Sequence, residues 1–227
     1  MNQPLDPENT IKKLPAAVVN SIVNSVNKAY QLADQIVEDY PLCQHGPHQS
    51  RIVGFNRYAF IENSVHKDWE EGILIGHAEW IPFSSNESGY YLLYKYNGIS
   101  ITFSHIKQPL DLPKRSEYRL DRAHDNQLRL NDPFYHEAQE DSANFVFVHG
   151  DKNLDFARII MLGVNEAGQQ VALYRSENLV QGNFGQSVDS VPPSTPITPA
   201  NMEIIQETKL QVLDKFIEKE QNSDSNE

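Results

Sequence analysis

The sequence predicts an α+β fold: a mainly antiparallel sheet of about six or seven strands, packed against an N-terminal amphipathic helix, with a tethered C-terminal helix. Three observations predict it. An Asn-Gly dipeptide joins two strand-like runs between residues 90 and 106, apolar residues recur at helical spacing after Pro15, and further strand-like runs follow a charged insert at about residues 108–141.

The dipeptide Asn97-Gly98 tolerates the positive φ angles that a two-residue type I′ hairpin turn requires. Because side chains alternate across a strand, such a turn puts six apolar residues on one face. These six pair as Tyr96 with Ile99, Tyr94 with Ile101, and Leu92 with Phe103. We expect this face to pack in the core and the opposite, more polar face to be at least partly exposed to water.

Residues 1–14 are expected to form a mobile arm, and a helix is expected from Pro15 to the residues before Pro41. Proline suits the first turn of a helix, and the residue before a proline disfavours helical geometry. Apolar residues in this segment follow three- and four-residue spacing, which predicts a helix that covers the sheet. Self-association through the same stripe is the alternative.

The remaining elements of a single domain over residues 15–180 are expected to be mostly strands. Residues 51–62 are rich in aromatic and β-branched side chains and predict a strand with an irregularity near Gly54. Residues 63–72 are polar and typical of a helix or turn. Further strands are expected over residues 73–83, 144–148, 156–164 and 170–174.

The composition changes after residue 180. Residues 181–199 are rich in Gly, Ser and Pro, which is typical of a linker. An amphipathic helix is expected over 200–219, and the polar tail 220–227 is expected to be disordered. The candidate partner-binding residues on this helix are its apolar stripe: Met202, Ile205, Val212, Leu213, Phe216 and Ile217.

Composition limits the classes of partner. Acidic residues outnumber basic ones by 31 to 19, for a net charge of −12, and such a chain repels nucleic-acid phosphates through its overall field. The single cysteine, Cys43, allows no internal disulfide, and no apolar run is long enough to span a membrane. We therefore expect a cytoplasmic protein without a membrane partner.

The chain lacks the short motifs typical of nucleotide-binding proteins, serine hydrolases and zinc proteases. A metal-dependent nuclease site remains as a hypothesis on the segment HGDKNLD, where hard carboxylate ligands gather near a strand end. Its candidate residues are His149, Asp151, Lys152 and Asp155. A plain polar turn between two strands explains the same residues and is the favoured interpretation.

Positive charge is concentrated in the insert, where five residues are candidates for contacting phosphates: Lys114, Arg115, Arg119, Arg122 and Arg129. Acidic residues are interleaved with them. Mixed-sign patterns are typical of a solvated face with local ion pairs, so nucleic-acid binding through residues 114–129 is the less favoured interpretation.

These observations favour a non-enzymatic interaction or regulatory protein that binds a protein partner, or a second copy, through the C-terminal helix, and that needs no cofactor. Antitoxins, immunity proteins and phage–host conflict proteins are comparable by analogy alone. The first alternative is the nuclease, which would require a divalent metal. The second is a small-ligand-binding domain whose pocket is lined by the tyrosines of the hairpin.

Overall fold

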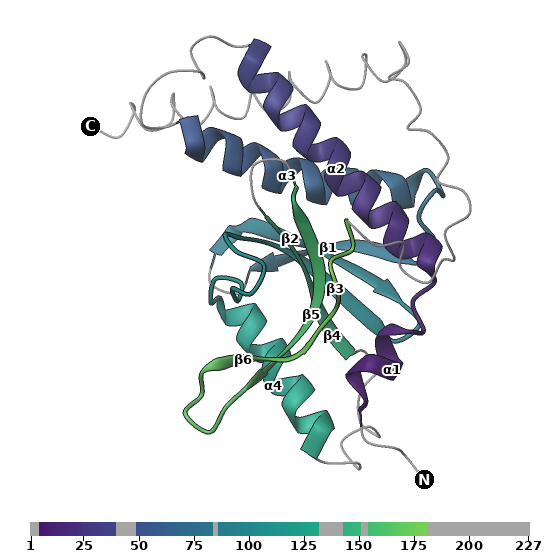
Figure 1. The fold of residues 1–227 in the computed structure, drawn as a ribbon, viewed down its shortest axis with the longest axis vertical. Helices are drawn as coiled ribbons and strands as arrows, with labels where there is room; N and C mark the ends of the chain where they lie inside the picture. The colour runs from purple at the N-terminus through teal and green to yellow at the C-terminus, as the bar shows by residue number, and fades with distance from the viewer. Residues whose placement is uncertain (1–4, 40–48, 84–85, 132–142, 151–153, 181–227) are drawn as a thin grey trace. The chain divides into compact units, whose positions relative to one another are not determined.

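The computed structural model describes residues 5–39, 49–83, 86–131, 143–150 and 154–180. These residues form three layers (Figure 1). Helices α2 (Ala16–Asp39) and α3 (Gln49–Glu70) cover one face of a six-stranded sheet, and α4 (Glu117–Asn131) covers the other. The predicted α+β class is confirmed for this part of the chain.

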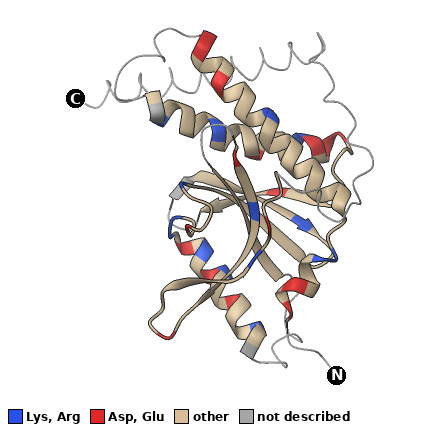
Figure 2. Cartoon of the chain, viewed as in Figure 1, with Lys and Arg blue, Asp and Glu red and all other residues tan. Residues whose placement is uncertain are grey.

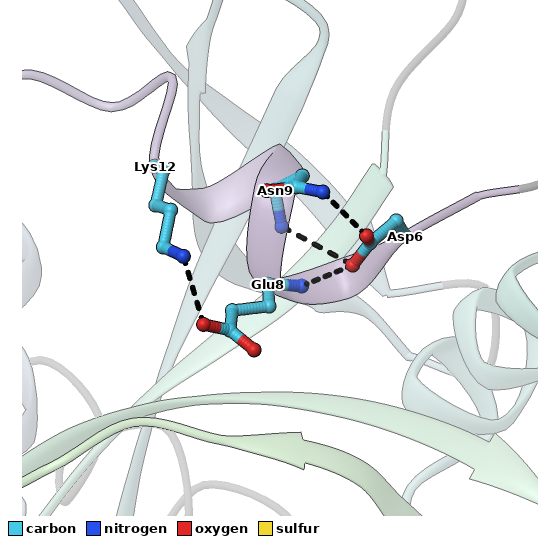
Figure 3. Close-up of polar contacts among 4 residues, drawn as sticks. All are labelled: Asp6, Glu8, Asn9 and Lys12. Carbon is cyan, nitrogen blue, oxygen red and sulfur yellow. Dashed lines mark hydrogen bonds and ion pairs between the residues drawn. The ribbon is translucent and has the colours of Figure 1, made fainter.

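The short helix α1 (Pro7–Ile11) lies within the segment that the sequence predicted to be an arm. Asp6 caps it by accepting from the backbone N–H groups of Glu8 and Asn9, as Figure 3 shows. A carboxylate satisfies the unpaired amides of a helix N-terminus in this way. Ile11 and Leu14 are buried in the main hydrophobic core, which α2, α3 and the sheet form together. This burial ties the N-terminal segment to the domain.

Helix α2 follows the prediction closely, because it begins one residue after Pro15 and ends at Asp39. Its apolar stripe is buried against α3 and the sheet. The buried residues of α2 are Val18, Val19, Ile22, Ser25, Val26, Ala29, Tyr30, Ala33 and Val37. The stripe packs on the chain's own domain, as expected for an amphipathic helix.

The strand predicted over residues 51–62 is wrong, because these residues belong to α3. Apolar residues of α3 at helical spacing, Phe60, Ile61 and Val65, are buried in the main core. The polar residues Asn56 and Glu62 are buried on the same helix. A buried stripe that contains polar residues breaks the apolar periodicity on which recognition of a helix depends.

The sheet has the strand order β1-β2-β3-β4-β5-β6. The strands are β1 His77–Phe83, β2 Asn86–Tyr96, β3 Ile99–Ile106, β4 Ala143–Gly150, β5 Phe156–Val164 and β6 Gln170–Arg175. Every neighbouring pair is antiparallel except β3 and β4, which are parallel. Parallel strands need a crossover connection, and α4 lies within it.

The hairpin turn is confirmed. Asn97 and Gly98 have φ angles of 43° and 73°, as a type I′ turn requires. Tyr96 pairs with Ile99 and Tyr94 pairs with Ile101. The third predicted pair, Leu92 with Phe103, is not part of the ladder, which stops at Tyr94 and Ile101.

The second face of the hairpin is more deeply buried than expected, although Lys95 on this face is exposed. Ser100, Thr102 and Ser104 of β3 are all buried. Helix α4 lies over this face and forms a second, smaller core with the sheet. That core consists of Ile106, Ala123, Val146, Val148, Phe156, Ile160 and Leu162.

The predicted C-terminal helix over residues 200–219, with its candidate partner-binding residues, lies outside the described residues, as do the linker and the tail. No helix in the described ranges is both long and apolar enough to cross a membrane.

Candidate functional site

The residues of the nuclease hypothesis do not form one exposed group in the described structure. His149 is buried on β4, and Asp155 is exposed just before β5. Asp151 and Lys152 lie outside the described residues. Among the residues that are described, no group of three or more His, Cys, Asp or Glu side chains is placed to hold a metal ion.

His149 sits at the end of β4, beside its register partner His105 on the parallel strand β3. Its Nδ1 is 2.8 Å from the hydroxyl of Tyr30 on α2. Burial, followed by the charges of His105 and Arg57, lowers the pKa of His149 to about 3. The imidazole is therefore neutral at neutral pH, and its contact with Tyr30 links α2 to the sheet.

The five basic candidate residues of the insert differ in their exposure to solvent. Figure 2 shows both signs of charge along this helix. Lys114 and Arg115 precede the helix and are exposed, whereas Arg119 and Arg129 are buried and Arg122 is half-buried. The Arg119 guanidinium donates to backbone carbonyl oxygens of Lys114 and Phe103. Nucleic-acid binding through residues 114–129 stays a prediction.

Polar side chains of α4 contact the sheet directly. Arg122 donates to the Asn144 side chain at 2.7 Å and to the Tyr91 hydroxyl at 3.3 Å. Asn126 donates to the carbonyl oxygens of Asn144 and Leu162 and accepts from the Asn144 N–H. Asn126 therefore bridges β4 and β5 beyond the last ladder pair, Phe145 with Met161.

A second bridge lies where β2 and β3 separate. Leu92 donates its backbone N–H to the carboxylate of Glu62 at 3.1 Å. Arg119 donates to the carbonyl oxygen of Phe103 at 3.3 Å and to that of Lys114 at 2.8 Å. Side chains from α3 and α4 thus form hydrogen bonds with backbone groups of β2 and β3 that the ladder does not pair.

Glu62 is the most perturbed carboxyl group among the described residues. Burial raises its pKa to about 7, although the Leu92 N–H, a hydrogen bond with Tyr58 and the charge of Arg119 all act in the opposite direction. Burial also raises the pKa of Tyr58, with Glu62 as the next cause. Perturbed groups of this kind occur at functional sites and in structural networks alike.

Two tyrosines of the hairpin take part in packing within the described structure. Tyr94 is buried in the main core, and Tyr91 stacks on Tyr118 of α4 with ring centroids 4.1 Å apart. A cavity between α4 and the sheet has a volume of about 10 Å³. That space holds roughly one water molecule, so it is too small for an organic ligand.

The most distinctive surface is formed by four residues at the end of α3 and on β1: His66, Trp69, His77 and Trp80. We name it the aromatic–histidine surface. The ring of His66 lies 5.3 Å from Trp69 and 5.5 Å from Trp80, and Trp69 lies 5.0 Å from His77. Trp80 is 37% exposed.

The aromatic–histidine surface is held in place by polar contacts. The indole N–H of Trp69 donates to the Gly76 carbonyl at 3.0 Å. Nearby Ile73 and Ile75 are each more than half exposed. Lys95 pairs with Glu79 at 2.5 Å. The surface is therefore an ordered apolar area with a charged rim, which is how protein interfaces are composed.

Sequence patterns do not reveal this surface because its members belong to two elements, α3 and β1, which meet only in the folded chain. The two tryptophans are separated by ten residues and become neighbours when α3 packs beside β1. The one available signal was compositional: both tryptophans of the chain flank the same short connection.

Comparison of the chain with models of known protein families, with curated proteins and with solved structures finds no match.

Proposed function

We propose that this chain is an acidic interaction protein that binds a protein partner through the aromatic–histidine surface. The observation that carries the proposal is the position of its two tryptophans. Trp69 and Trp80 both lie in this one surface, and Trp80 is substantially exposed. Tryptophan is enriched among the residues that dominate binding energy at protein interfaces.

The sheet edge beside this surface supports the proposal. Within the described residues β1 has a single sheet neighbour, β2, so its other side presents backbone groups to which an extended segment can bind. In the segment that carries the surface, residues 66–80, the acidic residues Asp68, Glu70, Glu71 and Glu79 outnumber the single lysine, Lys67. A partner segment that carries basic residues complements this charge.

Tryptophan fluorescence tests the proposal directly, because both reporters lie in the proposed interface. Tagged protein is used to recover partners from a lysate of the organism that encodes it, and each recovered protein is then titrated against the purified chain. We expect a saturable change in emission and reduced quenching by acrylamide. A partner that binds without either change would contradict the proposed interface.

A matched pair of variants distinguishes specific binding at this surface from non-specific binding through exposed apolar residues. Trp80→Ala is expected to weaken partner binding by about tenfold or more, since a central interface tryptophan is worth ~2 kcal/mol or more. Leu110→Ala is the control, because Leu110 is 75% exposed but lies in the loop beside β6, at the other edge of the sheet. Equal affinity of both variants would refute the proposal.

The predicted helix over residues 200–219 offers a second place for a partner to bind. Deleting residues 200–227 tests it independently. If binding survives this deletion and is lost in Trp80→Ala, the aromatic–histidine surface alone carries the interaction. If deletion abolishes binding and Trp80→Ala does not, the C-terminal segment carries it instead.

A further inference from the structure

Two arginines of α4, Arg119 and Arg122, approach the sheet without a carboxylate partner. Their guanidinium groups donate to the carbonyls of Lys114 and Phe103, to the Asn144 side chain and to the Tyr91 hydroxyl, all of which are neutral. Neither arginine forms an ion pair in the described structure. Arg119 is buried, and a buried charge without a directly paired opposite charge is costly.

The two carboxylates that Arg119 and Arg122 affect electrostatically, Glu62 and Glu79, are engaged with other groups. Glu62 affects Arg119 electrostatically, but it accepts from the Leu92 N–H and bonds to Tyr58. Glu79 is affected by Arg122, yet its carboxylate pairs with Lys95. Among the described residues, neither carboxylate therefore forms a direct ion pair with Arg119 or Arg122.

Both arginines line the cavity of about 10 Å³, together with Thr102, Asn126 and Asn144. Two polar atoms of the lining residues are buried and lack a hydrogen-bond partner: the hydroxyl of Thr102 and the Nε of Arg119. Thr102 is 2% exposed and Arg119 is 9% exposed. Both groups can donate a hydrogen bond, so the cavity presents unused donors beside two positive charges.

We propose that this cavity binds one small monovalent anion of about the size of chloride, held by Arg119, Arg122 and the Thr102 hydroxyl. The volume of about 10 Å³ admits one water molecule or one small monatomic ion, which excludes sulfate, phosphate and carboxylate ligands. An anion satisfies the orphaned donors and neutralises part of the charge, whereas a water molecule satisfies the donors alone. The site joins α4 to β3 and β4, so its occupancy stabilises the packing of these elements.

Chloride dependence of unfolding tests the proposal in solution. The full-length protein is unfolded in urea with sodium chloride or sodium gluconate at equal ionic strength, since gluconate is too large for the cavity. Above the dissociation constant, each tenfold rise in chloride should lower the unfolding equilibrium constant by about tenfold in wild type. A Thr102→Val protein, of nearly the same shape, should show a much weaker dependence.

The control is Ser104→Ala, because Ser104 is buried on the same face of β3 but does not line the cavity. It should respond to chloride as wild type does. General salt effects act on all three proteins and cancel in the comparison. Equal chloride dependence in wild type and Thr102→Val would overturn the proposal.

Bromide gives the direct structural readout. Crystals of wild type grown in sodium bromide should show an anomalous peak between Arg119, Arg122 and Thr102, which is absent in the Thr102→Val crystals. An ordered water at this position in bromide, with no anomalous signal, would also overturn the proposal and assign the cavity to water.

Discussion

Glu62 and Arg119 form hydrogen bonds, from opposite faces of the sheet, with backbone groups at the point where β2 and β3 separate. Glu62 bonds to Leu92 and Arg119 bonds to Phe103, two residues that would pair with each other if the hairpin ladder continued. Hydrogen-bonded pairs alternate along an antiparallel ladder. With Tyr96–Ile99 and Tyr94–Ile101 in register, Leu92 and Phe103 are the next positions of the same series. Leu92 donates instead to Glu62 of α3, and Phe103 accepts from Arg119 of α4.

This arrangement explains why the two helical layers carry buried polar residues. Where strands separate, their backbone groups lose partners, and an unpaired buried group costs ~1–3 kcal/mol. Glu62 and Arg119 satisfy such groups between β2 and β3, and Asn126 satisfies them between β4 and β5. The helices therefore complete the sheet as well as cover it.

Replacing Glu62 by glutamine should stabilise the protein at alkaline pH. Burial raises the pKa of Glu62 to about 7 from a reference value of 4.5, so the folded state binds more protons between these values. The stability that this group contributes is complete below pH 4.5 and is lost as the pH rises through 7. Urea unfolding from pH 4.5 to 8.5 should show Glu62→Gln gaining up to roughly 3 kcal/mol over wild type.

Glu166→Gln is the control for that experiment, because Glu166 is exposed in the turn between β5 and β6. Its stability should follow wild type within ~0.5 kcal/mol at every pH. A Glu62→Gln profile parallel to wild type would show that Glu62 titrates normally in the folded protein.

His149 should have the opposite pH dependence. Its pKa is lowered from 6.5 to about 3 by burial first, so the unfolded chain binds a proton that the folded protein excludes. Its contribution is complete above pH 6.5 and is lost as the pH falls through 3, by up to roughly 1.4 kcal/mol for each pH unit. Chemical unfolding should show this acid slope in wild type but not in a Tyr30→Phe, His149→Phe double variant.

The double variant removes both partners of the buried contact, so neither polar atom is left unpaired. Exposed His124 on α4 supplies the control, since His124→Gln should keep the acid slope of wild type. Persistence of the slope in the double variant would assign it to other groups.

Replacing each of two glycines by alanine should change the free energy of unfolding in opposite directions. At Gly150 on β4 an added Cβ would lie 2.2 Å from the Phe156 ring and 2.3 Å from the Ile106 carbonyl. At Gly54, within α3, nothing lies within 4 Å. We expect Gly150→Ala to lose ~1–3 kcal/mol or more through overpacking and Gly54→Ala to gain ~0.5–1 kcal/mol from helix propensity. Thermal unfolding measures both, and a stabilised Gly150→Ala would refute the tight packing.

Asn126 should be among the most sensitive positions of α4. It is 1% exposed and makes three hydrogen bonds to the backbone of β4 and β5. Asn126→Ala leaves these groups unpaired and should cost roughly 3 kcal/mol or more in urea unfolding. The exposed neighbour His124, changed to alanine, should cost less than ~0.5 kcal/mol. Similar costs for the two would mean that water replaces the Asn126 side chain.

The sequence was sufficient to predict those elements whose structure depends on interactions between residues a few positions apart. The Asn97-Gly98 turn and the pairs next to it follow from the φ angles that the turn demands. Helix α2 follows from apolar spacing and from Pro15 before its first turn. In both cases the signal comes from residues in one element, so no knowledge of the partner element is required.

The sequence-based prediction was wrong for elements whose buried face contains polar residues. Helix α3 was assigned a strand in part because Asn56 and Glu62 occupy buried positions and obscure its apolar stripe. The arginines of α4 were expected on a solvated face for the same reason, since arginine is rarely buried without a partner. Their partners, such as Phe103 and Asn144, belong to distant strands.

The sequence by itself determined the α+β class, the hairpin at Asn97-Gly98, helix α2 and most of the strands, because turn geometry and side-chain periodicity are local properties. Tertiary structure alone decided that β2 and β3 separate after Tyr94, that Glu62 and Arg119 serve the freed backbone groups, and that Trp69 and Trp80 share a surface. Each of these depends on residues from different elements meeting in space. That meeting is determined by how the layers pack, which no single stretch of the chain encodes.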